Sequence, residues 1–252
     1  MWVLLPLVIL TVLPWFVDLR PNEIDLMKVL QPPSRSHPLG TDENGRDVLR
    51  RLLAGAQFTI GIGVASAALS LAIGTIFGAV SGSVGGMVDD VIMRFTDLVL
   101  ALPTLFVILV FSTLVRPGVL QLVLLIGLTG WMPVARVVRG AARDVRARQF
   151  VVAAQSYGAG GWWIVRHHII PNLQSVIAIT GVMQLSRAIL TEATISFLGM
   201  GIQPPDATWG SMLSSAQGYL LLSPHLAFAP GVALAVTLLS VATLSFHDQK
   251  RL

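Results

Sequence analysis

Three ionisable side chains lie within or beside stretches that otherwise contain only uncharged residues: Asp97, Arg187 and Glu192. A charge among apolar residues is costly, so each is a candidate to brace a helix, line a pathway for a polar solute or relay protons. Arg187 and Glu192 are five residues apart, which does not align them as a pair on one helix face. Asp97 and Arg94 have the three-residue spacing of a local ion pair. We expect bracing roles, with pathway lining and a proton relay as the alternatives.

Other reactive groups are sparse. The chain has no cysteine, which rules out disulfides and thiolate metal sites. His37 and His225 are far apart in sequence and give little support to a metal site. Ser186 and Ser196 have no histidine in the same apolar stretch, and no G-x-x-x-x-G-K-[ST] phosphate-binding sequence is present. We therefore expect no catalytic residue, no metal and no cofactor or ATP site in this chain.

The composition identifies the environment in which these residues work. Of the 252 residues, 54% are hydrophobic and only 12% are charged, whereas soluble domains carry about 25% charged residues. The mean hydropathy of +0.75 agrees. This excludes a soluble enzyme, a nucleic-acid-binding domain and a disordered chain, despite a net charge of +4. We predict an all-α, polytopic membrane protein that contacts lipid and no nucleic acid.

Apolar stretches long enough to span a membrane, roughly 20 residues each, predict six transmembrane helices. A further uncharged stretch at 149–165 is polar and glycine-rich and is flanked by arginines, so we exclude it. The first stretch lacks a basic start and a small-residue cleavage site, which favours a retained helix over a signal peptide, and Met1 need not be the true start. The expected spans lie at residues 1–17, 52–88, 98–115, 117–135, 167–186 and 228–246.

Basic residues give the orientation. Residues 136–166 contain six arginines and a single acidic residue, Asp144, and the tail adds Lys250 and Arg251. Positive charge marks the cytoplasmic side, so this loop and both termini are expected there. The charges of residues 18–51 balance, six basic against six acidic, as suits the outer side. The expected order is a first helix at 1–17, an extracytoplasmic segment at 18–51 and a membrane domain at 52–252 with a cytoplasmic loop at 136–171.

One expected helix carries small residues at four-residue spacing: Ser70, Gly74, Gly78 and Gly82. Such a ladder allows two helix backbones to approach closely in lipid. We expect it to pack within the chain, with a seam between subunits as the alternative.

The cytoplasmic loop predicts two short helices outside the membrane. An apolar helix near residues 150–154 is broken by Gly158, Gly160 and Gly161. An amphipathic stretch at 162–170 ends at Pro171, which can open the next membrane helix. Apolar side chains here have no lipid to cover them, and such a patch usually marks a protein interface.

This loop resembles the EAA loop of ABC importer permeases, in which E-A-A, three residues, Gly and nine residues precede I-x-L-P. Val152 stands where that family usually has Glu, and His168 where the general motif has Ile; a histidine there is familiar in the peptide-permease branch. We expect Val152 to change how the loop is braced and not whether it docks. The resemblance implies a contact with an ATPase through Val152, Ala153, Ala154, Gly158, Ala159, Gly160, His168 and Pro171.

Three further segments resemble the C-type permeases of the dipeptide, oligopeptide and nickel transport family. They are the HPLGTD-x-x-GRD sequence at 37–47, the D-x-x-L-A-x-P sequence at 97–103 and the segment from Glu192 to the Thr-Trp-Gly at 208–210. The tail at 247–251 departs from the usual family ending. Together the resemblance implies a type I ABC importer fold in a prokaryotic inner membrane.

The resemblance also implies partners. These are a second permease subunit, two ATPase subunits that hold ATP and magnesium, and an extracytoplasmic solute-binding protein. Closure of the ATPases on ATP would push the loop and rock the membrane helices between two access states. Peptides are the expected solute, with nickel chelates or glutathione as alternatives. A proton-coupled secondary transporter that uses Asp97 and Glu192 is the competing class, although the sequence shows no internal repeat typical of one.

Overall fold

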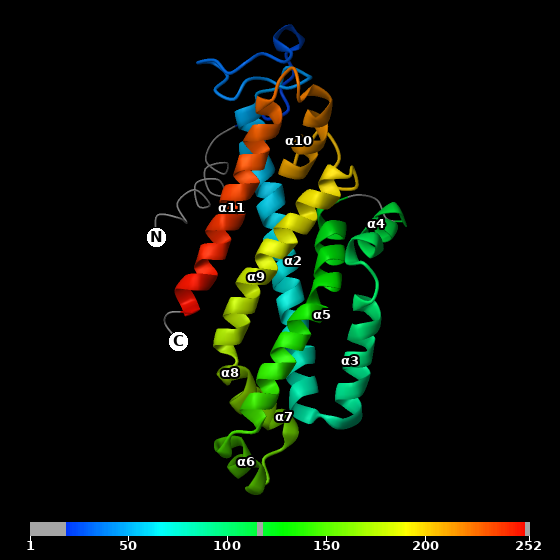
Figure 1. Ribbon diagram of the computed structural model, residues 1–252, viewed down its shortest axis with the longest axis vertical. Coiled ribbons are helices and arrows are strands. Elements are labelled where there is room, and N and C mark those ends of the chain that lie inside the picture. The colour runs from blue at the N-terminus through cyan, green and yellow to red at the C-terminus, as the bar shows by residue number, and fades with distance from the viewer. Residues whose placement is uncertain (1–18, 115–117, 250–252) are drawn as a thin grey trace.

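The computed structural model describes residues 19–114 and 118–249, with side chains described up to residue 244 (Figure 1). The span expected at residues 1–17 and the basic tail residues Lys250 and Arg251 lie outside the described part. Within it the regular secondary structure is helical, apart from one isolated bridge between Thr41 and Asp47. The all-α class is therefore confirmed.

Four long helices form an elongated bundle: α2 (Val48–Val84), α5 (Val119–Arg146), α9 (Gln174–Phe197) and α11 (His225–Gln249). All four are apolar and long enough to cross a membrane, whose hydrocarbon core is about 30 Å thick. The remaining elements are η3 (Leu26–Lys28), α3 (Gly86–Leu100), α4 (Thr104–Leu114), α6 (Gln149–Ser156), α7 (Gly161–Ile164), the π-helical turn η4 (Val165–Ile169), α8 (Ile170–Asn172), α10 (Trp209–Ala216) and η5 (Gln217–Tyr219).

The span expected at 98–115 is wrong in its bounds and shape. The chain instead forms α3 and α4, which meet at an angle of 80°. Pro103 lies in the break between them; proline lacks an N–H donor and disfavours helical geometry in the residue before it. The described residues thus contain four single-helix spans, or five if the bent pair counts as one, which is the number expected for this part of the chain because the sixth expected span, at 1–17, lies outside it.

Other expected boundaries also shift. Helix α2 begins at Val48 and not at Leu52, because the Asp47 carboxylate caps it by accepting a hydrogen bond from the Arg50 backbone N–H at 2.9 Å. It ends at Val84, before Gly85 and Gly86, which both have positive φ. Helix α5 runs eleven residues beyond the expected end at residue 135, so the arginine-bearing start of the loop continues the span as one helix.

The small-residue ladder of α2 packs against α5 in the same chain. A Cβ added to Gly74 would lie 2.5 Å from the Val134 side chain, and one added to Gly78 would lie 2.6 Å from the Ala135 carbonyl oxygen. Gly82 approaches α5 equally closely, and Ser70 donates a hydrogen bond to the Gly127 carbonyl at 2.9 Å. The ladder therefore serves packing within the subunit.

At the other end of the bundle, α10 is inserted between α2 and α9. Trp209 is fully buried; its indole N–H donates to the Leu52 carbonyl at 2.9 Å, and its backbone N–H donates to the Thr59 hydroxyl at 3.1 Å. Glu192 of α9 is also fully buried here and accepts a hydrogen bond from the Ser196 hydroxyl at 2.7 Å. Its other oxygen, Oε2, is buried without a hydrogen-bond partner in the described chain. Glu192 thus lies inside the packed end of the bundle, where we expect it to have a bracing role.

The α2–α5 packing predicts opposite effects for two glycines of one helix. Gly78→Ala should destabilise the protein by about 1–3 kcal/mol, because the added methyl group meets a backbone oxygen that has no room to move. Gly61→Ala is the matched control, since nothing lies within 4 Å of its Cβ position; it should be neutral or stabilising by up to about 1 kcal/mol. Thermal unfolding in detergent measures both, and equal midpoints for the two variants would contradict the packing.

The bracing role of Glu192 predicts that shape and hydrogen-bonding capacity matter more than charge. Glu192→Gln should be tolerated, because the amide oxygen still accepts from Ser196. Glu192→Leu should destabilise the protein by about 1–3 kcal/mol more, because it leaves the buried Ser196 hydroxyl without this partner. Unfolding midpoints of the two variants decide the matter; a leucine variant as stable as the glutamine variant would exclude bracing.

Candidate functional site

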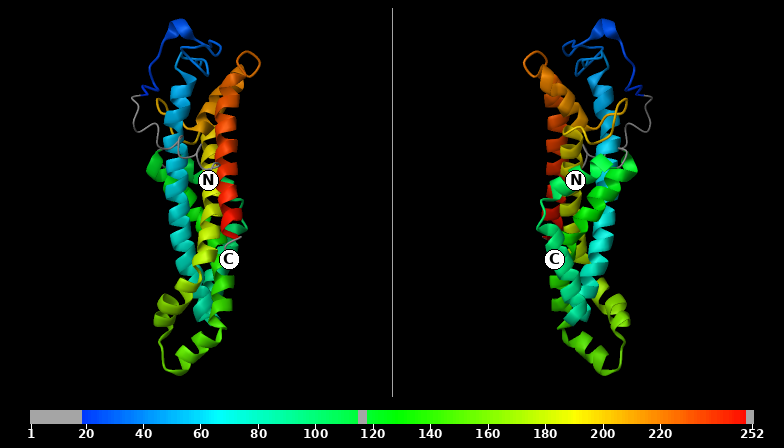
Figure 2. Two further views of the ribbon diagram at one scale, coloured as in Figure 1. Left: turned by 90° about the vertical axis from the view of Figure 1, so that its left-hand side faces the viewer. Right: turned by 90° about the vertical axis from the view of Figure 1, so that its right-hand side faces the viewer.

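The loop between α5 and α9 projects beyond the end of the bundle, opposite residues 19–47 (Figure 2). Its inner face is anchored by apolar side chains: Val151 of α6 and Ile169 of η4 are fully buried. They belong to one cluster with Val138, Ala142 and Val145 of α5. Because several elements share this cluster, the loop is held firmly against the spanning helix.

The outer face of the loop carries large apolar side chains that nothing in the described chain covers. Tyr157 is 93% exposed and Trp162 67%. Val152, where the family usually has Glu, is half exposed on α6 beside them. A patch of this kind, anchored behind and bare in front, is what a docking surface for another protein requires.

Gly158 shapes the turn that separates α6 from α7. Its φ of +85° lies in the left-handed region that side chains disfavour. Its N–H donates to the Gln155 carbonyl at 2.9 Å, and the Ala159 N–H donates to the Ala154 carbonyl at 3.0 Å, which closes the end of α6. Gly160, in contrast, has an ordinary φ of −67°. Only the first of these glycines is therefore required by the backbone of the turn.

The residues expected at the ATPase contact divide between two neighbouring parts of the loop. Val152, Ala153, Ala154, Gly158, Ala159 and Gly160 lie on α6 and the turn after it. The His168 ring lies in η4 against Phe150 of α6, with ring centres 5.8 Å apart, and against Trp163 at 5.0 Å. These ring contacts bring the two halves of the loop together.

The sequence suggests that Pro171 opens the next membrane helix, but the structure differs. Pro171 lies within α8, and α9 begins at Gln174. The cause is Leu173, which is fully buried in the cluster behind the loop and has a non-helical ψ of 1°. The chain turns to bury this side chain before the spanning helix starts.

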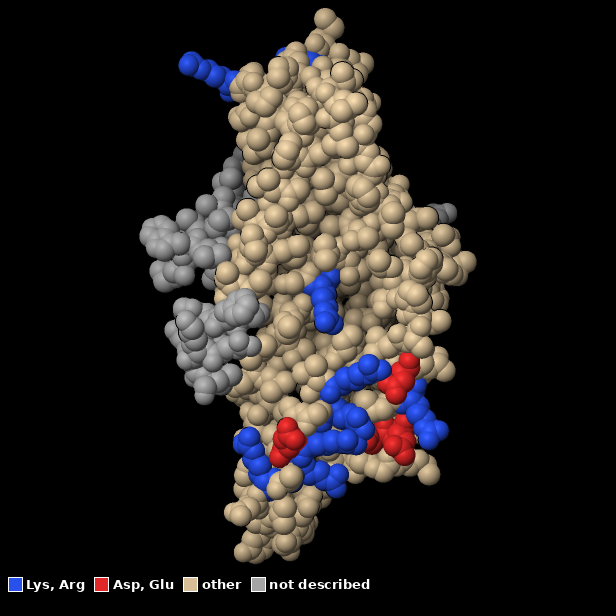
Figure 3. Space-filling view, viewed as in Figure 1, with Lys and Arg blue, Asp and Glu red and all other residues tan. Residues whose placement is uncertain are grey.

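A cluster of charges ties the loop end of α5 to α3 and α2. The buried Asp89 accepts hydrogen bonds from Arg139 Nε at 2.5 Å and Nη2 at 2.6 Å. Arg143 and the Ser81 hydroxyl donate to the same carboxylate. Arg146 extends the cluster by donating to the Val84 carbonyl at 3.1 Å. On the face shown in Figure 3, charged side chains gather in a band beside the loop, and the long middle zone is almost without charge.

The sequence analysis missed this cluster. Arginines 136, 139, 143 and 146 have helical spacing that places them on one face of α5, and this spacing was the available signal. The expected pair between Asp97 and Arg94 is also wrong. Asp97 forms its ion pair with Arg136 of α5, because the helices pack so that this guanidinium reaches it.

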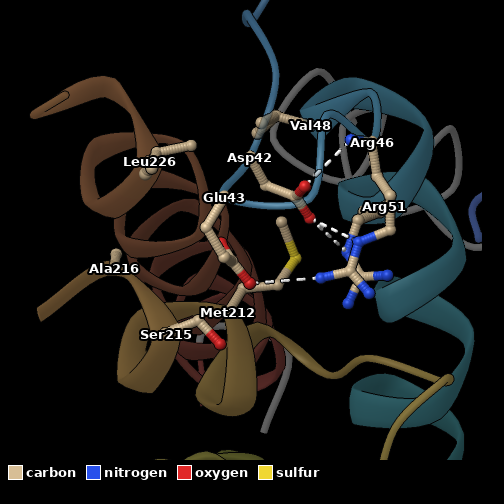
Figure 4. A pocket seen from close by; sticks show the side chains of 9 residues that line it. All are labelled: Asp42, Glu43, Arg46, Val48, Arg51, Met212, Ser215, Ala216 and Leu226. Carbon is tan, nitrogen blue, oxygen red and sulfur yellow. Dashed lines mark hydrogen bonds and ion pairs between the residues drawn. The ribbon is translucent and has the colours of Figure 1, made fainter. Parts of the chain in front are cut away.

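A second charged cluster holds the opposite end of the protein together. Asp42 accepts from Arg46 Nε at 2.6 Å and pairs with Arg51 Nε at 3.5 Å. Arg51 also donates to the Asn22 side chain at 3.1 Å and to the Pro205 carbonyl at 3.4 Å. Figure 4 shows Asp42, Arg46 and Arg51 around a small hollow between residues 42–51 and helices α10 and α11. The HPLGTD-type segment is thus a cap that joins α2 to the chain before α10.

Arg187 and Glu192 lie in different surroundings, as their spacing suggested. Glu192 is buried at the α10 junction, whereas Arg187 is exposed and lines a hollow of about 300 Å³ between α5 and α9. Among the described residues, no group of three His, Asp or Glu side chains converges as a metal site requires. The sites offered by this chain are therefore a docking surface and a hollowed helix face.

Residues 74–249 match the family described as binding-protein-dependent transport system inner membrane component. Among curated relatives, the chain is 34% identical to the oligopeptide transport system permease protein OppC of Bacillus subtilis, over 89% of this chain and 74% of the relative. It is 35% identical to OppC of Haemophilus influenzae, over 92% and 75%. It is 32% identical to the glutathione transport system permease protein GsiD of Pectobacterium atrosepticum, over 87% and 73%. With the spanning helices and the anchored loop, these matches show that the chain belongs to the family of inner-membrane permease components of binding-protein-dependent ABC importers.

Proposed function

We propose that this chain is a permease subunit of an ATP-driven importer of di- and oligopeptides. The observation that carries the proposal is the loop at 147–173, whose inner face is anchored to α5 and whose outer face is apolar and bare. The names of two relatives, both oligopeptide permeases, favour peptides as the solute. The glutathione permease relative makes glutathione, itself a small peptide, the second candidate.

The partners follow from this role. A second permease would complete the pathway, and two ATPase subunits would hold ATP and magnesium. An extracytoplasmic binding protein would deliver the solute. The outer face of α6 and its turn would dock into an ATPase subunit, with Val152 supplying an apolar contact where the family usually has a carboxylate. The loop and both termini would lie in the cytoplasm, which the band of arginines on α5 supports.

Transmission of force is the task that the geometry suits. A push on α6 reaches α5 through the buried Val151, and the Asp89 cluster then joins α5 to α3 and α2. These contacts favour movement of the helices as a body over bending of the loop alone. Asp97 and Glu192 are both engaged within the chain, which favours bracing over the proton relay of a secondary transporter.

The turn at Gly158 gives a test of coupling. Gly158→Val should strain the turn by roughly 1–3 kcal/mol, because valine resists positive φ, and should misplace α6. ATP hydrolysis should then lose its dependence on loaded binding protein, or the ATPases should dissociate. Gly140→Val is the matched control, since Gly140 is exposed on α5 outside the proposed ATPase contact and nothing lies within 4 Å of its Cβ position. Normal uptake by the Gly158 variant would contradict the coupling role.

Reconstitution tests the proposed function as a whole. Proteoliposomes that contain both permeases, the ATPases and the binding protein should take up a tripeptide only with ATP. Omission of the second permease should abolish uptake, because the proposed pathway is formed by both permeases together. An uncoupler that collapses the proton gradient should leave uptake unchanged. Loss of uptake on addition of the uncoupler would instead favour proton-driven transport.

A further inference from the structure

Arg187 is placed in a way that neither bracing nor docking explains. It is residue 14 of the 24 in α9, so it lies near the middle of that span. The side chain is exposed, and none of the ion pairs between described residues includes it. An ionised group at such a depth is expensive unless it meets water or an opposite charge.

Three carboxylates of the neighbouring helices, Asp97, Asp89 and Glu192, do not neutralise Arg187. Asp97 is paired with Arg136, and Asp89 is held by Arg139 and Arg143. Glu192 lies five residues along the same helix, but it is fully buried at the α10 junction. The guanidinium is therefore free to bind an anion that comes from outside these residues.

Two adjoining hollows meet at Arg187. One, of about 300 Å³, extends along α9 toward the loop and is lined by Thr180 and Val176. The other, of about 230 Å³, extends the opposite way and is lined by Thr191 and Thr104. Pro133 and Gln184 border both hollows, together with Arg187 itself. A solute that moves along this face of α9 passes the guanidinium.

A row of polar residues follows this face of α9. Thr180, Gln184, Arg187 and Thr191 follow one another at intervals of three or four residues, which places them on one face of α9. Thr180 and Gln184 are largely buried and, apart from Arg187, the other side chains that line the first hollow are apolar. Arg187 is the single charged side chain that lines either hollow within the described chain. Both hollows are therefore largely uncharged and hold one fixed positive charge.

We propose that Arg187 binds the carboxylate of the solute during its passage along α9. The inference rests on the proposed peptide importer. A guanidinium donates two parallel hydrogen bonds to a carboxylate, which gives both strength and orientation. Every linear peptide with a free C-terminus carries one such group whatever its side chains, so a single arginine serves a varied set of solutes. An acidic residue of the second permease is the competing counter-ion.

The test uses the complete importer in proteoliposomes, with trialanine and trialanine C-terminal amide as solutes. The binding protein is saturated with each peptide. Arg187→Gln should lower the maximal uptake rate of trialanine at least tenfold, and Arg187→Lys should retain at least a third of it. Uptake of the amide should change less than twofold. Arg94→Gln, at an exposed arginine on α3 that lines neither hollow, should leave both rates unchanged.

Charge reversal supplies a comparison that does not need the amide. Arg187→Glu should slow trialanine more than Arg187→Gln does, with ATP hydrolysis and the KM for loaded binding protein within twofold of wild type. Equal trialanine uptake rates for Arg187→Glu and Arg187→Gln would overturn the proposal. An equal fall in the uptake rates of trialanine and its amide in the Arg187→Gln variant would also overturn it. Loss of co-purification with the second permease would assign the counter-ion to that subunit instead. Failure of wild type to take up trialanine would reject the peptide function and this inference with it, whereas normal wild-type uptake with an unaffected Arg187→Gln variant rejects the inference alone.

Discussion

The close approach of α2 and α5 is the constraint on which the rest of the structure depends. In lipid, helices gain little from burying apolar surface against one another, so association relies on van der Waals contact and interhelical hydrogen bonds. Gly74 and Gly78 allow backbone atoms of the two helices to meet without an intervening side chain. This contact brings the end of α2 to the arginines of α5, so that Ser81 and Arg139 reach one carboxylate. It also fixes the face of α5 that, with α9, borders the hollow.

The described helices have a charged cluster at each end; Figure 3 shows the one beside the loop and the almost uncharged zone next to it. At one end Asp42 and Arg51 join the cap to the segment before α10; at the other, Asp89 gathers three helices beside the loop. Ion pairs are placed where water or headgroups reduce the cost of charge, while the middle relies on close helix packing. Arg187 is the exception, and its lack of a partner in the described chain marks it for function.

Much of the fold could be predicted because hydropathy patterns, glycine spacing and arginine clusters can be recognised within short segments of the sequence. The four straight spans, the short helices of the loop and the packing of the Gly74–Gly78 ladder all depend on residues close in sequence. The partner of Asp97 could not be predicted, because the sequence allows an ion pair with either Arg94 or Arg136. The packing of the helices selects Arg136. The break at Pro103 was visible as a residue, but a proline in a span can kink a helix or end it, and the surrounding packing decides which. The roles of individual loop residues stay predictions.

The position of the small-residue ladder along helix α2 has a mechanical consequence. At 1.5 Å per residue the 37 residues of the helix form an unbroken rod about 55 Å long. The tightest part of the seam with α5, the ladder from Ser70 to Gly82, lies in the half that ends near the loop, and the contact continues to Ile62, which shares an apolar cluster with Leu122 of α5. The other half, which bears the cap and α10, is a lever arm of about 33 Å, and a tilt of about 10° about the ladder carries its tip by about 6 Å. The helix therefore amplifies movement: a small displacement of its end near the loop becomes a larger displacement of its end at the cap.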